Sequence, residues 1–372
     1  MIIRNGEVYT ENFCFEKKNI RIRKGILEEI TGRELHPEDG EEAFDAEGLY
    51  VIPGLSDIHF HGAMGADLCD GSDEALSVMA RYEKSVGVTN ICPATMTLPI
   101  DRIADICRMA AAHPGSEDEA ELMGINLEGP FISPDRVGAQ APEHVIKPDP
   151  EALSRILDAA GGLGRLITIA PEAEGALPVI QSFRDRIRFS IGHTAADYEQ
   201  AVAGLDAGAD HVTHLYNAMP PFSHRAPGVI GAAAERDGVM AELICDGVHV
   251  HASAVKAAFR LFGPERIVLI SDSMRACGMP DGDYDLGGIP VVKKGKEARH
   301  EDGTLAGSVT NLYDCMVEAI RMGIAREDAV RAAAVNPPAS IGLGGSYGII
   351  AEGRRARLLL ADRSWRLIRV IA

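Results

Sequence analysis

In the segment Pro53-Gly54-Leu55-Ser56-Asp57-Ile58-His59-Phe60-His61-Gly62, a short apolar run ends in two alternate histidines. In a β-strand, residues two positions apart project from the same face. His59 and His61 are therefore predicted to project together from one strand end, as two ligands of a metal ion do. Asp57 is predicted to share that face and to orient one of these ligands from behind. A lone His-x-His pair is a weak motif, so the rest of the chain must support it.

Outward from this stretch, apolar runs alternate with helical segments. The runs are short and rich in Ile, Val and Leu, which is typical of strands buried on both faces. They cover residues 55–58, 89–94, 122–127, 166–170, 187–191, 211–213, 241–245 and 266–270. Helices are predicted at 73–86, 101–112, 252–262, 308–322 and 326–334, and another is opened by a capping box at Thr194-Ala-Ala-Asp197 and ends at Ala207. Eight strands over about 290 residues predict a (β/α)8 TIM barrel. The alternative, a doubly wound open sheet, lacks its dinucleotide fingerprint.

The two ends of the chain have a different pattern. Residues 1–9, 19–23 and 26–30 are predicted as strands, with turns at Asn5-Gly6 and Lys24-Gly25, and further strands follow at 348–350 and 358–360. We expect the termini to pair into one small domain of residues 1–53 and 346–372, beside a barrel domain of residues 54–345.

The composition is that of an acidic globular protein. The chain has 372 residues, a formal net charge of −18 and 46% hydrophobic residues. Such a charge argues against nucleic acid and anionic membranes as partners. No apolar run approaches the ~20 residues of a membrane span, and the N-terminal residues lack the apolar region of a signal peptide. The seven cysteines are scattered and form no C-x-x-C pair. We therefore expect a cytoplasmic protein with reduced thiols.

Polar side chains end six of the eight apolar runs. In a barrel these strand ends meet at one face, where active sites lie. Besides His59 and His61, the strand-end residues are Glu128, His193, His214, Asp246, His249 and Asp272. Imidazoles and carboxylates are the ligands of a divalent ion such as zinc.

Chemical roles follow from this set. Glu128, His193 and His214 can bind one ion and leave a position for water. Asp272 can then act as the base that takes a proton from that water. His59 and His61 can hold a second ion, with Glu128 bridging, or complete the first site.

Seven short motifs occur in order along the chain. They are PGLSDIHFHG (53–62), LEGPFISP (127–134), GHT (192–194), THLYNAM (213–219), DGVH (246–249), SDSM (271–274) and LAGS (305–308). Through these motifs the chain resembles the N-acetylglucosamine-6-phosphate deacetylase family of the amidohydrolase superfamily. The resemblance covers nearly the whole chain. It implies a (β/α)8 barrel with a small β-sandwich domain formed by both termini.

The resemblance also implies roles for single residues. Glu128, His193 and His214 correspond to metal ligands, and Asp272 corresponds to the general base and acid. Groups implied to bind the sugar phosphate are Gln140, Asn217, the Ala218 backbone, Arg225 and His249, with Leu305 and Ala306 in a loop that closes on the acetyl group. Gln140 stands where many members carry a histidine. The arginine matching Arg225 reaches a neighbouring subunit's site, which implies a homodimer.

The expected activity is therefore hydrolysis of N-acetylglucosamine 6-phosphate to glucosamine 6-phosphate and acetate. Zinc is the first candidate for the metal, with iron, manganese or cobalt as alternatives, and one or two ions per chain. Residues 281–302 are predicted to form a hairpin-like lid. Two alternatives remain open: another amidohydrolase, such as an N-acetylgalactosamine 6-phosphate deacetylase, and a non-catalytic sugar-phosphate-binding protein.

Overall fold

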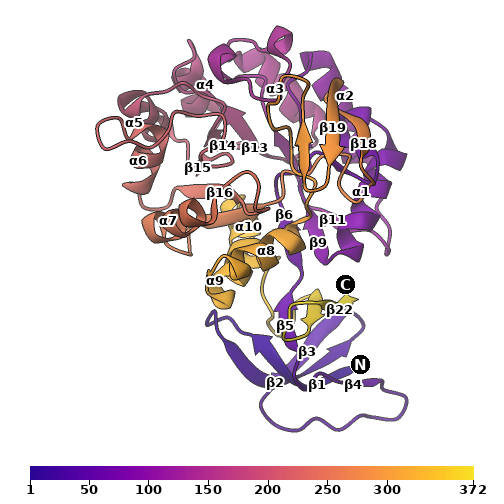
Figure 1. Ribbon diagram of the computed structural model, residues 1–372. Coiled ribbons are helices and arrows are strands. Elements are labelled where there is room, and N and C mark those ends of the chain that lie inside the picture. The colour runs from indigo at the N-terminus through magenta and orange to yellow at the C-terminus, as the bar shows by residue number, and fades with distance from the viewer.

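The barrel predicted from the central strands is present in the computed structural model, which describes residues 1–372 (Figure 1). Its strands are β6 (Leu55–Asp57), β9 (Val88–Ile91), β10 (Ala94–Thr95), β11 (Glu121–Leu122), β12 (Ile125–Leu127), β13 (Gly164–Ile169), β14 (Arg188–Ile191), β15 (His211–Val212), β16 (Met240–Ile244) and β17 (Ile267–Ile270). Parallel pairing runs β10-β12-β13-β14-β15-β16-β17, and β9 pairs with both β6 and β11. The wall closes through backbone hydrogen bonds from Asp272 N to His59 O (2.9 Å) and from His61 N to Ser273 O (2.7 Å).

Helices surround this wall and bury its outer face (Figure 1). They are α1 (Asp73–Ser85), α2 (Ile100–Ala112), α3 (Pro150–Ala159), α4 (Ala176–Phe183), α5 (Tyr198–Ala207), α6 (Gly228–Ala234), α7 (Ala252–Phe262), α8 (Leu312–Arg321), α9 (Arg326–Val330) and α10 (Asn336–Ser340), with a π-helical turn at Arg331–Val335 and 3-10 turns at Leu68–Asp70, Pro134–Arg136 and Pro142–His144. Neighbouring residues of one strand enter different apolar clusters: Val268 and Ile270 pack together with Ile58, whereas Ile267 and Leu269 pack in the cluster that the helices share. Burial on both faces explains why these strands are uniformly apolar.

Two predicted helix starts are wrong. The residue that caps α5 is Asp197, whose side chain accepts the Gln200 N–H in a capping box, so the helix begins at Tyr198. The Thr194 hydroxyl donates to Glu172 instead. Likewise, α8 begins at Leu312 rather than near 308, because the Asn311 side chain provides its N-terminal cap.

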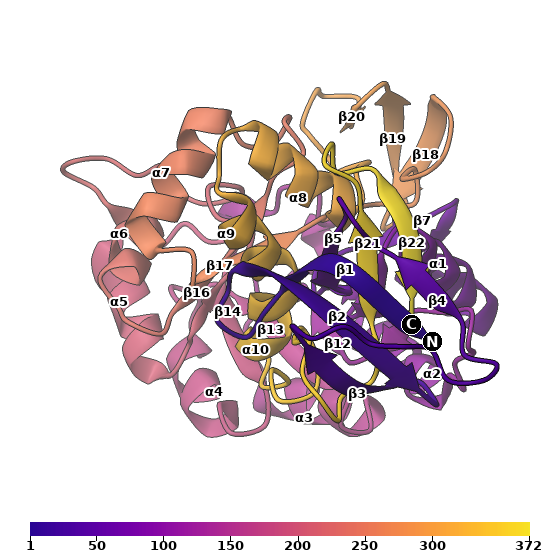
Figure 2. The ribbon, with the colours of Figure 1, turned by 90° about the horizontal axis from the view of Figure 1, so that it is seen from below.

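The chain termini pair in one seven-stranded sheet beside the barrel (Figures 1 and 2). Its strands are β1 (Ile2–Tyr9), β2 (Phe15–Arg23), β3 (Ile26–Thr31), β4 (Ala43–Asp45), β5 (Tyr50–Pro53), β21 (Leu358–Ala361) and β22 (Leu367–Ile371). Leu358 and Leu360 pack in an apolar cluster of the sheet's own, whereas Leu359 and Ala361 join the cluster of the barrel. The predicted pairing of the termini is thus confirmed, but the predicted strand at residues 348–350 does not form, and the C-terminal strands are β21 and β22. A division at residues 53/54 and 345/346 remains a prediction.

One predicted turn is a bulge. Asn5 and Gly6 lie inside β1, where the register against β2 shifts and Asn5 adopts a φ of 62°. The Asn5 N–H donates to the Asn19 side chain (2.8 Å), which holds this irregular backbone. Lys24 and Gly25 do form the predicted hairpin turn between β2 and β3, with φ values of 51° and 73°.

The insertion after β17 is the predicted hairpin. Strands β18 (Gly282–Leu286), β19 (Ile289–Lys294) and β20 (Glu297–Arg299) pair antiparallel, and a further small hairpin joins β7 (Gly62–Ala63) to β8 (Ala66–Asp67). The insertion packs through an apolar cluster of Met96, Met274, Ala276, Leu286, Val291, Ala298 and Ala306. This cluster joins the hairpin to the barrel's strand ends. Its predicted role as a lid remains a prediction.

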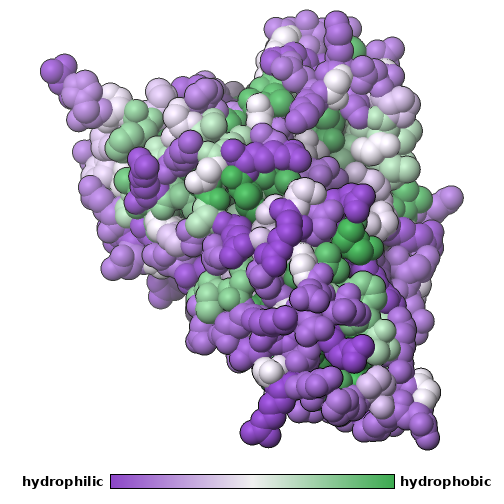
Figure 3. Space-filling view, turned by 60° about the horizontal axis from the view of Figure 1, so that its bottom comes forward, coloured by the Kyte–Doolittle hydropathy of each residue, from purple (hydrophilic) through white to green (hydrophobic).

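The face of the molecule seen in Figure 3 carries small apolar patches separated by hydrophilic residues. The large hydrophobic side chains that are exposed include Phe13, Met64 and Phe222, which lie far apart in the chain. None of the helices is long and apolar enough to cross a membrane.

Candidate active site

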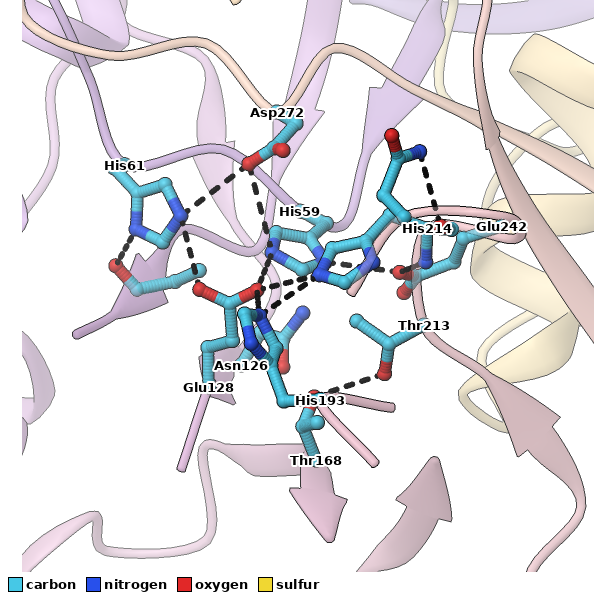
Figure 4. Close-up of polar contacts among 12 residues, drawn as sticks. His59, His61, Asn126, Glu128, Thr168, His193, Thr213, His214, Glu242 and Asp272 are labelled. Atoms are coloured by element: carbon cyan, nitrogen blue, oxygen red, sulfur yellow. Dashed lines mark hydrogen bonds and ion pairs between the residues drawn. The ribbon is translucent and has the colours of Figure 1, made fainter. Parts of the chain in front are cut away.

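Three of the predicted site residues follow barrel strands in unusual backbone conformations. His193, His214 and Asp272 have φ angles of 44°, 28° and 49°. Left-handed backbone is costly for residues other than glycine and concentrates at functional sites. These residues follow β14, β15 and β17, and their side chains point toward one cluster and line one cavity (Figure 4). This strain indicates that the direction of these side chains matters more than local backbone energy.

Glu128, directly after β12, lies at the centre of the cluster (Figure 4). Its Oε1 lies 3.1 Å from His193 Nε2, 3.1 Å from His214 Nε2 and 3.2 Å from His59 Nε2. Its Oε2 lies 3.3 Å from His61 Nε2. The two ring nitrogens of His193 and His214 are themselves only 3.0 Å apart. Four imidazoles therefore present the same kind of atom to one carboxylate.

The outer nitrogens of these rings show which atom is free to bind a metal. His61 Nδ1 faces the Ala94 carbonyl (3.3 Å), and His193 Nδ1 faces the Arg136 carbonyl (3.0 Å). A carbonyl oxygen only accepts, so each Nδ1 carries the hydrogen and leaves the Nε2 lone pair directed into the cluster. His59 Nε2 is wholly buried and has no hydrogen-bond partner, although it faces Glu128. The donor set therefore fits a divalent cation.

Two overlapping groups can hold an ion: Glu128 with His193 and His214, and Glu128 with His59 and His61. In each group the ligand atoms lie within 4.8 Å of one another, and every residue is buried. Glu128 belongs to both groups through its two oxygens. The arrangement can therefore accommodate one ion or two.

The electrostatics of the cluster favour positive charge. Burial would raise the pKa of Glu128, but the charges of His59 and His193 hold it well below its usual range. Burial would lower the pKa of His61, but hydrogen bonds to Asp272 and Glu128 raise it to about 10, so a proton and a metal ion compete for the lone pair of His61 Nε2. The carboxylates thus draw positive charge onto their neighbours, as a binding site for a cation requires.

Asp272 lies beside the metal-binding groups. Its Oδ1 is 3.3 Å from His61 Nε2 and 3.8 Å from His59 Nε2, and its side chain lines the cavity. Burial would raise the pKa of Asp272, but the hydrogen bond to His61 and the charge of His59 keep it below its usual range. An ionised carboxylate in this position can accept a proton from a bound water.

A cavity of about 190 Å³ opens above this cluster. The predicted site residues that line it are His61, Glu128, Gln140, His193, His214, Asn217, Ala218, His249, Asp272, Leu305 and Ala306. His59 lies beneath, wholly buried. Arg225 is the exception: it is exposed in the proline-rich loop after His214 and is not part of the lining.

Two residues predicted to bind substrate make bonds within the protein. Gln140 donates through Nε2 to Glu128 Oε2 and accepts the Thr97 N–H through Oε1 (2.6 Å). His249 contacts Asp246 Oδ2 (2.7 Å) and the Ala306 carbonyl (3.0 Å). Burial would lower the pKa of His249, but the hydrogen bond to Asp246 raises it. Both ring nitrogens of His249 thus face oxygen acceptors, an arrangement that favours the protonated ring on the cavity wall.

Comparison with known proteins decides the family. Residues 50–368 match the Amidohydrolase family. The chain belongs to the amidohydrolase family. An N-acetylglucosamine-6-phosphate deacetylase of Bacillus subtilis (strain 168) is 39% identical over 84% of this chain and 81% of its own. An N-acetylgalactosamine-6-phosphate deacetylase of Escherichia coli O157:H7 is 34% identical over 97% of this chain and 95% of its own.

Solved structures of amidohydrolases agree. An aspartate-to-alanine mutant of the N-acetyl-D-glucosamine-6-phosphate deacetylase of Mycobacterium smegmatis, in complex with N-acetyl-D-glucosamine-6-phosphate, superimposes with a TM-score of 0.92. It is 32% identical, and the match covers 100% of this chain and 97% of that one. These findings confirm the barrel fold and the resemblance drawn from the seven motifs.

In this amidohydrolase Asp57 does not orient a histidine ring from behind, so that prediction is wrong. Asp57 Oδ1 accepts the backbone N–H of His59 (3.1 Å), and Asp57 also lies near the Ser271 backbone. That short turn breaks the strand alternation on which the prediction relied. The His59 ring is held instead by Glu242 of β16, at 2.9 Å between Nδ1 and Oε2. The available signal was a lone acid inside an apolar strand, where an unpaired charge is costly.

Proposed function

We propose that this amidohydrolase hydrolyses N-acetyl-D-glucosamine 6-phosphate to D-glucosamine 6-phosphate and acetate. The main support is one cavity above a cluster in which a carboxylate and four imidazoles meet beside Asp272, on a fold that matches deacetylases over its whole length. The alternative of a non-catalytic binding protein is disfavoured, because binding alone needs neither an ionised Asp272 nor converging lone pairs.

The cofactor is proposed to be a divalent ion held by Glu128, His193 and His214, with His59 and His61 able to hold a second. Imidazole and carboxylate ligands suit zinc, with iron, manganese or cobalt as alternatives. Such an ion supplies Lewis acidity and lowers the pKa of water to about 7.

The protein's own residues are proposed to orient the substrate and move protons. Asp272 takes a proton from the attacking water and returns it to the leaving nitrogen, because its carboxylate is ionised and faces the cavity. Leu305 and Ala306 lie on the cavity wall and would enclose the acetyl group. Gln140, Asn217, the Ala218 backbone and His249 are proposed to bind the sugar phosphate.

Arg225 is proposed to act in a neighbouring subunit of a homodimer. It is exposed and outside the cavity lining of its own chain. A guanidinium group can bind a phosphate with two hydrogen bonds. Arg225→Ala should then raise KM for phosphorylated sugars much more than for free sugars, and sedimentation should show a dimer.

A cytoplasmic location is proposed from the cysteines. All seven are free thiols, which is typical of a reducing compartment.

The sugar epimer is the second candidate, because an N-acetylgalactosamine-6-phosphate deacetylase matches 97% of this chain. Acetate release should be measured with N-acetylglucosamine 6-phosphate, N-acetylgalactosamine 6-phosphate and unphosphorylated N-acetylglucosamine, before and after chelation. We expect the highest kcat/KM for the first and loss of activity after chelation. A higher value for the galactosamine epimer would reassign the substrate. No acetate from any of them would favour a binding protein.

A further inference from the structure

Glu242 is a wholly buried carboxylate whose role no sequence motif indicated. It is the one charged residue of β16, and its side chain is 0% exposed. One oxygen, Oε2, lies 2.9 Å from His59 Nδ1 and also accepts the backbone N–H of His214 at 3.1 Å. The other oxygen, Oε1, has no hydrogen-bond partner, and His211 Nδ1 lies 3.8 Å from it. Figure 4 shows Glu242 on the far side of His59 and His214 from Glu128.

The contact with His59 differs from those of two other rings of the cluster. His61 and His193 are oriented by backbone carbonyls, whereas His59 relies on a side chain. An ionised carboxylate accepts hydrogen bonds and donates none, so the facing Nδ1 must carry the hydrogen. A neutral ring then has its lone pair on Nε2, the atom that lies 3.2 Å from Glu128.

We infer that Glu242 is a positioning residue that holds His59 in the tautomer and orientation of a metal ligand. The same oxygen ties the strained backbone of His214 to His59, so one carboxylate links a ligand from each metal-binding group. This inference rests on the proposed metal centre. Without the acceptor, the ring can rotate or move its hydrogen to Nε2, and either change removes the lone pair from the cluster.

The test is a metal titration of the metal-free protein, with zinc bound per chain from elemental analysis and affinities from calorimetry. Glu242→Leu removes the acceptor and should lose the same ion that His59→Ala loses. Glu242→Gln keeps an oxygen acceptor without its charge, so it should keep that ion with about 10–100-fold weaker affinity. Glu83→Gln is the matched control, because Glu83 is also wholly buried and touches no metal-binding group. Its metal content should equal that of the wild type.

A double-mutant cycle separates positioning from a general structural effect. In the His59→Ala background, Glu242→Gln should not weaken metal binding further, since its partner is gone. Equal additional losses in both backgrounds would overturn the inference, as would unchanged zinc binding in Glu242→Leu or His59→Ala. A wild-type protein that binds no metal and releases no acetate would instead overturn the proposed function. An active, metal-loaded wild type whose Glu242 variants bind zinc normally would overturn this inference alone.

Discussion

At the active site, the backbone conformations and the burial of single residues are each unfavourable for folding. His193, His214 and Asp272 have left-handed backbone, and the central carboxylate is buried among rings. Each feature opposes folding on its own. Together they place the ring nitrogens and two carboxylates within a few ångströms, which is the arrangement that cation binding favours.

Asp272→Asn is the direct test of the proposed proton transfer. Asparagine tolerates left-handed backbone well, so the φ of 49° can be kept while the charge is removed. We expect kcat to fall about 10²–10⁴-fold. Zinc content and the thermal midpoint should stay close to those of the wild type. Turnover near the wild-type rate would remove Asp272 from the mechanism.

Glu83 on α1 gives a pH prediction. Burial raises the pKa of its carboxyl group well above the usual range, and the charge of Asp57 raises it further. In the unfolded chain a glutamate ionises above about pH 4.3. Between that pH and the raised folded pKa, the folded state binds more protons, so stability falls as pH rises.

Glu83→Gln removes this pH-dependent cost. At about pH 8 the variant should have a higher free energy of unfolding than the wild type. This difference should shrink as the pH approaches about 4. Urea denaturation across this range measures it. Glu74→Gln, an exposed acid of the same helix, is the control and should show little pH-dependent difference. A constant gap between Glu83→Gln and wild type at all pH values would contradict the assignment.

Single residues also show the limit of sequence reasoning. The types and strand-end positions of Glu128, His193, His214 and Asp272 could be predicted, because parallel strands bring their ends to one face. The wrong role for Asp57 followed from assuming regular alternation through residue 59. Its own side chain bonds the His59 N–H and ends that alternation. Glu242 was missed because its partner lies on another strand.

For the helices, competition between side chains for the N-terminal cap sets the residue at which a helix begins. Thr194 and Asp197 both have capping side chains, and the choice depended on Glu172, which binds the Thr194 hydroxyl. The Asn5-Gly6 pair was mistaken for a turn because its bulge depends on Asn19 of the neighbouring strand. Lys24-Gly25 was predictable because a two-residue hairpin turn is a local structure.

The β18–β19–β20 hairpin is predicted to control substrate binding more than chemistry. Leu286 lines the cavity, and Ala298 accepts the Ala306 N–H (3.0 Å), which holds the Leu305–Ala306 segment. Val291→Ala removes apolar contacts beneath the hairpin, with a local cost of about 1–3 kcal/mol. We expect KM to rise and kcat to change less, as measured by steady-state kinetics.

Val292→Ala is the matched control for this prediction. Val292 follows Val291 on the same strand, but it is 49% exposed whereas Val291 is 1% exposed. Its kinetic constants should stay within error of the wild type. Equal effects of the two substitutions would argue against a role for hairpin packing.

At the scale of the whole molecule, the terminal sheet and barrel share one apolar cluster. Trp365, the single tryptophan, lies in this junction with its ring stacked on Tyr50 at 4.7 Å. Its carbonyl accepts a hydrogen bond from the Tyr313 hydroxyl of α8 (3.1 Å). We therefore expect tryptophan fluorescence and far-UV circular dichroism to report the same denaturation midpoint. A fluorescence change at lower denaturant would show that the sheet separates first.

The position of the terminal sheet has a practical consequence. Strand β5 of this sheet leads directly into one end of β6, and His59 and His61 follow its other end. Five of the seven thiols are buried. A sixth, Cys69, accepts the Met96 N–H through its sulfur, and burial raises the pKa of the Cys69 thiol well above the usual range. Cys14, between β1 and β2, is therefore the thiol best placed for alkylation. Coupling through it would immobilise the protein on a support in one orientation, with the mouth of the barrel facing the solution.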